Sequence, residues 1–238
     1  MVLLTMDTSL ISELDSTKKL SVGLLLDTGA LEGLKKMPVD VFDGVYLGEV
    51  HNSALVLCVD VRNFSDFLCE NNEDKVFRLI KEFTANLLSC INQFGYGCSY
   101  YKLMGDGALV IWDETNKDTI TEALAIFNTY TEFLKDELFK PFDKLDLAGA
   151  LVTEKVYKYE ISAELSELKY RDYVGYGINL ACRLQTLARA NELILNEALA
   201  NYGVLHFKVS EKSNLLKELA LLKGLKDEDC KRILYYTR

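Results

Sequence analysis

The chain has 238 residues, of which 49% are hydrophobic and 26% charged, the balance of a packed domain rather than of a disordered chain. Its net charge of −9 argues against a nucleic-acid partner, which would require a basic patch. No apolar run approaches the ~18 residues of a membrane-spanning helix, so no membrane partner is expected. The six cysteines include no CxxC pair and mostly sit in apolar runs, which predicts reduced thiols and a cytoplasmic protein.

Two regions differ in pattern. Residues 1–45 carry scattered leucines that are interrupted by glycines and a proline at positions 29, 33, 38 and 44. We expect this stretch to be an N-terminal arm that packs on the domain or on a partner subunit. Residues 46–238 show sustained periodicity with no Gly/Ser-rich linker, and they are expected to form a single domain.

From residue 54 the apolar pattern alternates between strand and helix. The continuous apolar run 54–59 predicts a strand that is buried on both faces and ends at Asp60. Apolar spacing, turn residues and glycines predict the elements that follow. In chain order these are a short helix ending near 68 and capped by Asn63 or Ser65, a helix over 76–94, a hairpin of strands 99–103 and 108–112, helices over 118–138 and 177–190, and strands at 147–152, 193–195, 204–209, 219–222 and 233–236. The succession predicts an α/β (α+β) domain with a mixed sheet covered by helices.

Two carboxylates stand out in this pattern. Asp60 ends the first strand, and Asp106 lies between two glycines in the hairpin turn. If the hairpin pairs beside the first strand, both side chains converge at one end of the sheet. Carboxylate oxygens suit Mg²⁺ or Mn²⁺, which then recruit phosphate oxygens. The spacing leaves an alternative open, in which Asp60 caps the next helix and Asp106 is only a turn residue.

A third polar group lies on the predicted helix 177–190. Asn179 and Arg183 are four residues apart and therefore share one helix face. Such a pair can hold a sugar and stabilise charge on a transferring phosphoryl group, although a solvated polar face has the same spacing. The chain lacks a Walker A loop and the HExxH and GxSxG motifs. Its only histidines, His51 and His206, are expected to be structural.

Four segments resemble, in the same order, the motifs of class III adenylate and guanylate cyclases. They are the strand and metal loop ending in Asp60-Val61-Arg62-Asn63-Phe64-Ser65, the hairpin Lys102-Leu103-Met104-Gly105-Asp106-Gly107, the stretch from Asp172 to Arg183, and the late strand Leu222-Lys223-Gly224. The resemblance implies a mainly antiparallel sheet on a ferredoxin-like βαββαβ core, with residues 46–238 as the catalytic domain. It also implies a lyase that converts a nucleoside triphosphate (NTP) into a 3′,5′-cyclic monophosphate and pyrophosphate. Two Mg²⁺ or Mn²⁺ ions would assist, and a head-to-tail homodimer would form composite sites.

The same resemblance implies a role for each matched residue. Asp60, Asp106 and the carbonyl of Val61 would hold both metals. The residues expected to bind substrate are Phe64, Lys102, Asp172 and Lys223, with Lys102 and Asp172 reading the base edge and Lys223 the terminal phosphates. Asn179 would orient the ribose and Arg183 would stabilise the transition state. Tyr176 and Gly177 depart from the family pattern.

The base is not fixed by these residues. The Lys102–Asp172 pair resembles the adenylate pattern, but a donor and an acceptor match adenine and cytosine equally, and uracil in a shifted pose. The short arm, with no sensor segment before the domain, is similar to bacterial pyrimidine cyclases that make cyclic UMP or cyclic CMP in antiphage defence. Tyr46, His51 and Asn52 could shorten the base pocket. The sequence thus favours UTP or CTP, with ATP as the alternative and an inactive nucleotide-binding domain as a further one.

Overall fold

The structure is a computed structural model that describes residues 44–135, 145–163, 166–203, 208–210 and 213–237. The arm expected over 1–45 lies outside these ranges, except for its last two residues, which open the first strand. Among the described residues, no helix is both long and apolar enough to cross a membrane.

One mixed sheet forms the centre of the molecule. Its strands are β1 (Gly44–Arg62), β2 (Tyr100–Met104), β3 (Gly107–Trp112), β4 (Asp146–Ala163), β5 (Ser166–Val174), β6 (Glu192–Asn196), β7 (Lys208–Ser210) and β8 (Ile233–Thr237). Their order is β2-β3-β1-β4-β6-β8-β7, and β5 pairs with β4 beside this path. Among these described strands, only the β4–β6 pair is parallel. The mixed, mainly antiparallel sheet predicted from the sequence is therefore confirmed.

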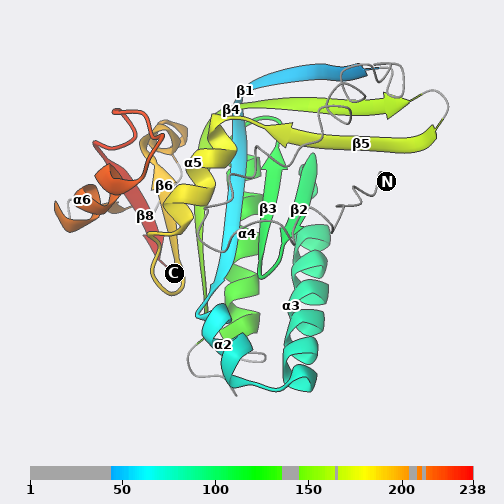
Figure 1. The fold of residues 1–238 in the computed structure, drawn as a ribbon. Coiled ribbons are helices and arrows are strands. Elements are labelled where there is room, and N and C mark those ends of the chain that lie inside the picture. The colour runs from blue at the N-terminus through cyan, green and yellow to red at the C-terminus, as the bar shows by residue number, and fades with distance from the viewer. Residues whose placement is uncertain (1–43, 136–144, 164–165, 204–207, 211–212, 238) are drawn as a thin grey trace, which may run out of the picture.

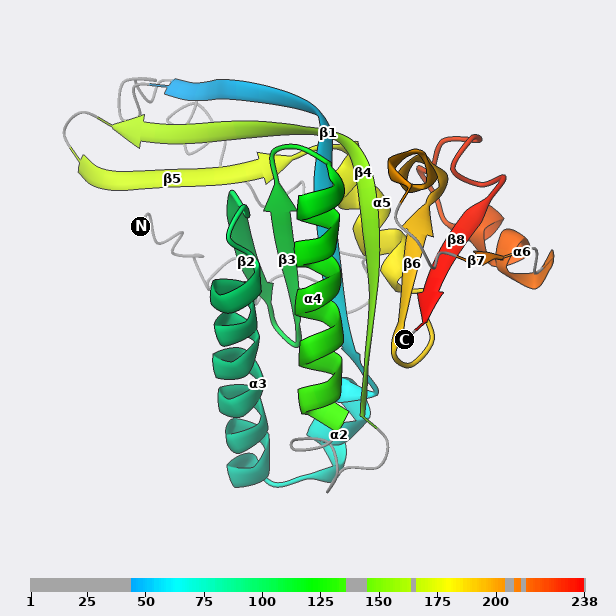
Figure 2. The ribbon, with the colours of Figure 1, turned by 180° about the vertical axis from the view of Figure 1, so that it is seen from behind.

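Helices cover both faces of this sheet (Figures 1 and 2). They are α2 (Phe64–Glu70), α3 (Glu73–Phe94), α4 (Lys117–Phe133), α5 (Tyr176–Gln185) and α6 (Ser213–Leu221), with a 3₁₀ helix over Glu197–Tyr202. Helices α3 and α4 lie on one face and α5 on the other. The succession β1-α3-β2-β3-α4-β4, with β4-β1-β3-β2 as spatial order, is the expected βαββαβ core.

Alternation along β1 divides the core into two layers. Successive side chains of a strand point to opposite faces, so Leu55 and Leu57 pack with α3 and α4, whereas Val56 and Cys58 pack with α5. All four are at most 3% exposed. The burial of this run on both faces was predicted correctly. Only Cys58 and Cys90 among the six cysteines are buried, and none forms a disulfide.

Strand β1 is much longer than the predicted run 54–59. Its N-terminal part pairs with the C-terminal part of β4, which also pairs with β5. We call these three segments, residues 44–51, 156–163 and 166–174, the ribbon; it projects from the end of the sheet (Figure 1). The β1–β4 ladder has two register shifts: the one between Leu47 and Glu49 lies within the ribbon, and the one between His51 and Ala54 marks where the ribbon joins the sheet.

Two predicted elements near the C-terminus need correction. The strand expected at 219–222 is wrong, because residues up to Leu221 belong to helix α6 and Leu222–Gly224 form a bend and turn. A short leucine-rich run has the same pattern in a helix and in a strand. The strand expected at 204–209 is seen only as β7, since 204–207 lie outside the described residues.

Candidate active site

Asp60 and Asp106 meet at one end of the sheet, as predicted. Asp60 lies opposite Gly107 in the β1–β3 register, and the backbone N–H of Val61 donates to the carbonyl of Asp106 at 3.1 Å. A β-carbon at Gly107 would lie 2.5 Å from the carbonyl oxygen of Val59, so only glycine allows this approach. The N-cap of α2 is Asn63, which excludes the alternative that Asp60 caps the helix.

The two carboxylates carry an excess of negative charge. Burial raises the pKa of Asp60, and the nearby Asp106 carboxylate raises it further. Burial also raises the pKa of Asp106. The amide of Gln185 donates to Asp60 Oδ2 at 2.9 Å, and the Arg62 guanidinium lies 3.8 Å from the same oxygen. Two oxygen ligands whose ionised forms disfavour each other fit a hard divalent cation such as Mg²⁺ or Mn²⁺.

Gln185 and Arg62 connect the C-terminal end of β1 to helix α5. Besides Asp60, Arg62 contacts the end of that helix, donating to the carbonyl oxygens of Gln185 and, at 3.1 Å, of Ala188. Neither role was predicted from the sequence, since Gln185 is 125 residues from Asp60 and belongs to no motif. Only the packing of α5 on β1 brings them together.

Lys102 and Asp172 form an ion pair between β2 and β5. Lys102 Nζ donates to Asp172 Oδ2 at 2.8 Å, and the hydroxyl of Tyr170 donates to the same oxygen at 2.6 Å. The other carboxylate oxygen accepts the backbone N–H of Tyr173 at 2.8 Å. Burial alone would raise the pKa of Asp172, but hydrogen bonds from Lys102, Tyr170, Tyr100 and the Tyr173 backbone lower it to about 2. The two predicted base-reading residues are thus adjacent within one chain.

Asn179 and Arg183 both lie on α5, Asn179 exposed and Arg183 half-buried. Lys223 is exposed in the turn after α6 rather than in a strand. The next residue, Gly224, has a φ of 78°, and a β-carbon there would lie 3.6 Å from Arg183 Nη2. The structure therefore brings the Lys223 turn beside Arg183.

Tyr176, one of the departures from the family pattern, holds that region on α5. Its hydroxyl donates to Asp229 Oδ2 at 2.8 Å and accepts the backbone N–H of Lys226 at 2.7 Å. The ammonium of Lys226 lies 4.3 Å from the centre of the Tyr176 ring, a cation–π contact. Tyr176 is thus a positioning residue for the segment that follows Lys223.

Phe64 is not gathered with the other predicted site residues. It is half-buried, packs against the core on the α3–α4 side and stacks on Phe67 with ring centres 6.2 Å apart. The residues expected to shorten the base pocket have other described surroundings. His51 faces Glu49 and Asp113, and Asn52 lines a hollow of about 320 Å³. The side chain of Tyr46 and all of His206 lie outside the described residues.

The pH dependence of the free energy of unfolding should reveal how much the Lys102–Asp172 ion pair stabilises the protein. The pKa of Asp172 is lowered, so its contribution to stability is complete above about pH 4 and is lost as the pH falls through about 2. We expect Asp172→Asn to reduce the free energy of unfolding at pH 7 by about 1–2 kcal/mol, discounted because Lys102 is 44% exposed. The difference in free energy of unfolding between wild type and Asp172→Asn, measured by urea titration, should shrink as the pH falls toward 2. The matched control is Glu160→Gln, which removes the more exposed Arg171–Glu160 pair. Parallel pH profiles of wild type and Asp172→Asn would contradict the assignment.

No protein-family model matches the sequence, and no curated protein matches it. Solved structures match the fold. The adenylyl cyclase CyaB from P. aeruginosa has a TM-score of 0.63 and 15% identity, covering 79% of this chain and 95% of its own. The guanylate cyclase domain of RhGC from Catenaria anguillulae, in complex with GTP, has a TM-score of 0.60 and 14% identity, covering 79% and 97%. The chain has the class III nucleotidyl cyclase fold.

A third structure with this cyclase fold bears on the choice of base. It is the catalytic core of a rhodopsin-guanylyl cyclase with converted specificity, in complex with ATPαS. Its TM-score is 0.63 at 14% identity, with 82% of this chain and 98% of that one covered. The three matched structures include an adenylyl cyclase, a GTP complex and an ATPαS complex, so the cyclase fold by itself does not select the base.

Proposed function

We propose that the chain is a nucleotidyl cyclase that converts an NTP into a 3′,5′-cyclic monophosphate and pyrophosphate. The observation that carries the proposal is the meeting of Asp60 and Asp106 at the end of β1, within a cyclase fold and beside the helix that bears Asn179 and Arg183. In this proposal Asp60, Asp106 and the Val61 carbonyl hold two Mg²⁺ or Mn²⁺ ions. When bound, the ions supply Lewis acidity at the ribose 3′-hydroxyl and charge neutralisation at the phosphates.

The protein's own groups do the positioning. The ribose 3′-oxygen attacks the α-phosphorus in line, pyrophosphate leaves, and the hydroxyl proton passes to solvent. Asn179, exposed on α5, orients the ribose, and Arg183 stabilises the charge that builds up on the α-phosphoryl oxygens. Lys223, in the turn next to Arg183, binds the terminal phosphates. Lys102 and Asp172 contact the edge of the base.

We also propose a head-to-tail homodimer with composite sites. Gln185 contacts Asp60, whereas Arg183, two residues earlier and thus roughly 200° around the helix, lies beside Gly224. Arg183 therefore faces away from the Asp60 carboxylate of its own chain, and a second chain is needed to bring the two groups onto one substrate. The guanylyl cyclase domain of RhoGC from Blastocladiella emersonii, which has this fold, is described as a non-canonical dimer in one structure and as monomeric in another.

For the base we propose a pyrimidine, with UTP or CTP as substrate. Supporting this, the hydroxyls of Tyr170 and Tyr100 bond to Asp172 alongside Lys102, so aromatic side chains occupy space at the base-reading pair. A smaller ring fits such a pocket better than a purine does. The cyclic pyrimidine nucleotide would then act as a second messenger in antiphage signalling. The second candidate is adenylate cyclase, which the Lys102–Asp172 pattern favours.

The test is turnover of UTP, CTP, ATP and GTP by the purified full chain with Mn²⁺, with products separated by chromatography. We expect UTP or CTP to react faster than ATP and GTP slowest. Because unmatched polar groups in a base pocket discriminate strongly, an ATP rate about tenfold above both pyrimidines would reject the pyrimidine assignment. Binding of an NTP with no cyclic product from any of the four would reject the cyclase assignment and favour an inactive nucleotide-binding domain.

A further inference from the structure

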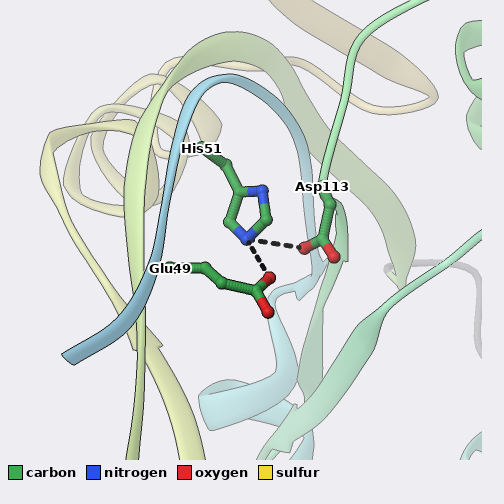
Figure 3. Close-up of side chains that lie close together, drawn as sticks. All are labelled: Glu49, His51 and Asp113. Carbon is green, nitrogen blue, oxygen red and sulfur yellow. Dashed lines mark ion pairs between the residues drawn. The ribbon is translucent and has the colours of Figure 1, made fainter. Parts of the chain in front are cut away.

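A second cluster of metal-ligating groups lies far from Asp60 and Asp106. Glu49 and His51 lie on β1 where the ribbon joins the sheet, and Asp113 directly follows β3 (Figure 3). The six residues of strand β3 separate Asp113 from Asp106, so the Cα atoms of the two residues lie roughly 20 Å apart at about 3.3 Å per residue. The cluster is therefore independent of the proposed active site.

The three side chains point at one another with separations that suit a shared cation (Figure 3). His51 Nε2 lies 3.3 Å from Glu49 Oε2 and 3.4 Å from Asp113 Oδ1, and ligand atoms of all three residues lie within 4.8 Å of one another. Two atoms bonded to Zn²⁺ at about 2.0–2.1 Å with a tetrahedral angle are about 3.3–3.4 Å apart. Both imidazole–carboxylate separations fall in that interval.

Among the described residues, the imidazole nitrogen at the centre of the cluster has no hydrogen-bond partner. His51 Nε2 is buried and lies within ion-pair distance of both carboxylates, yet its alignment makes a hydrogen bond to neither. A buried donor or acceptor that makes no hydrogen bond destabilises the folded protein. A metal ion bonded to the nitrogen would remove this penalty. The His51 side chain is 15% exposed and Glu49 is 56% exposed, so an ion has a path from solvent.

A neighbouring tyrosine holds the Asp113 carboxylate in the way that outer hydrogen-bond donors hold metal ligands. The hydroxyl of Tyr173 donates to Asp113 Oδ1 at 2.8 Å, and its ring lies 6.2 Å from the His51 ring. Such outer hydrogen bonds orient ligands and raise metal affinity. On the other side, Lys158 Nζ lies 3.3 Å from Glu49 Oε2, so its positive charge competes with a cation for this oxygen.

We propose that Glu49, His51 and Asp113 form a site for a divalent transition-metal ion, with Zn²⁺ the best fit. An imidazole with two carboxylates suits such ions, whereas Mg²⁺ and Ca²⁺ prefer sites made only of oxygen. Three protein ligands leave the fourth tetrahedral position for water. The ion would cross-link β1 to the end of β3 at the base of the ribbon. The neighbour of Tyr173 on β5 is Asp172, so the site also supports the strand that carries this residue.

The experiment measures Zn²⁺ binding by calorimetry on metal-stripped full chain carrying Asp60→Ala and Asp106→Ala, so that the active-site carboxylates cannot contribute. We expect one Zn²⁺ per chain. Adding His51→Ala or Asp113→Asn should weaken binding by at least about 100-fold, and Tyr173→Phe by about tenfold. Lys158→Met should tighten it by about threefold, because a competing positive charge is removed. Co²⁺ should show the visible absorption of tetrahedral coordination, and His51→Ala should abolish it.

Two controls keep the result specific to this cluster. Cys58→Ser tests the thiol pair Cys58–Cys182, whose sulfur atoms are 3.7 Å apart, and should leave Zn²⁺ binding unchanged. Circular dichroism and thermal unfolding report whether each variant folds; should His51→Ala fail to fold, Asp113→Asn, Tyr173→Phe and Lys158→Met decide the matter. Absence of Zn²⁺ binding, or binding that these variants leave unaltered, would overturn the proposal. Because the readout is binding, the outcome is independent of cyclase activity.

Discussion

Asp60→Ala and Asp106→Ala are each expected to lower the rate of NTP cyclisation by about 10³-fold, the upper end of the loss seen when one group that stabilises transition-state charge is removed. Each variant deletes a carboxylate that both ions would share, so loss of either one disables the pair. The main-chain bond from Val61 to Asp106 does not depend on the side chain, so the hairpin should keep its place. The measurement is formation of cyclic nucleotide with Mn²⁺ and with Mg²⁺.

The control for this result is Asp60→Asn, which keeps the shape of the side chain and an acceptor for Gln185. Burial and the Asp106 charge raise the pKa of Asp60, so the ionised Asp60 carboxylate destabilises the folded protein when no metal is bound. Stability of metal-free Asp60→Asn in urea should therefore equal or exceed that of wild type, while added Mn²⁺ should stabilise only the wild type. Retained turnover in the alanine variants, or an unfolded asparagine variant, would contradict the metal assignment.

The sequence predicted the part of the candidate site that is formed by segments close to one another in the chain. The apolar run before Asp60 and the glycines around Asp106 determine a buried strand and a tight hairpin, and pairing of adjacent segments then brings the two carboxylates together. The hairpin was likewise predicted correctly, and so was the long helix α3, which was expected over 76–94 and spans Glu73–Phe94 with Gly95 as its C-cap. These elements are encoded by residues close to one another in the chain.

What the sequence did not predict depends on contacts between distant segments. The ribbon half of β1 is interrupted by Gly48 and carries polar residues such as Glu49, so its extended form comes from the ladder with β4, about a hundred residues away. Gln185 reaches Asp60 and Tyr176 reaches Asp229 only after α5 has packed on the sheet. A short apolar run such as 219–222 cannot by itself distinguish a helix from a strand.

Mixing two inactive variants should restore activity if the sites are composite. In a head-to-tail dimer the Asp60 of one protomer works with the Arg183 of its partner, so an Asp60→Ala/Arg183→Ala heterodimer contains one intact site and one doubly defective site. After random exchange of equal amounts, half the dimers are mixed and half their sites are intact, which predicts about a quarter of wild-type activity.

The positions of Gln185 and Arg183 on α5 are the reason for expecting composite sites. Gln185 occupies the face of the helix that touches Asp60, and Arg183 lies on the opposite side, beside Gly224. An Asp60→Ala/Asp106→Ala mixture is the matched control and should stay inactive, because both changes fall in the same half of each site. Subunit exchange is verified with two affinity tags. Exchange without recovery in the first mixture would mean that each chain holds a whole site, and that α5 must rotate or shift to bring Arg183 to the Asp60 end of its own sheet.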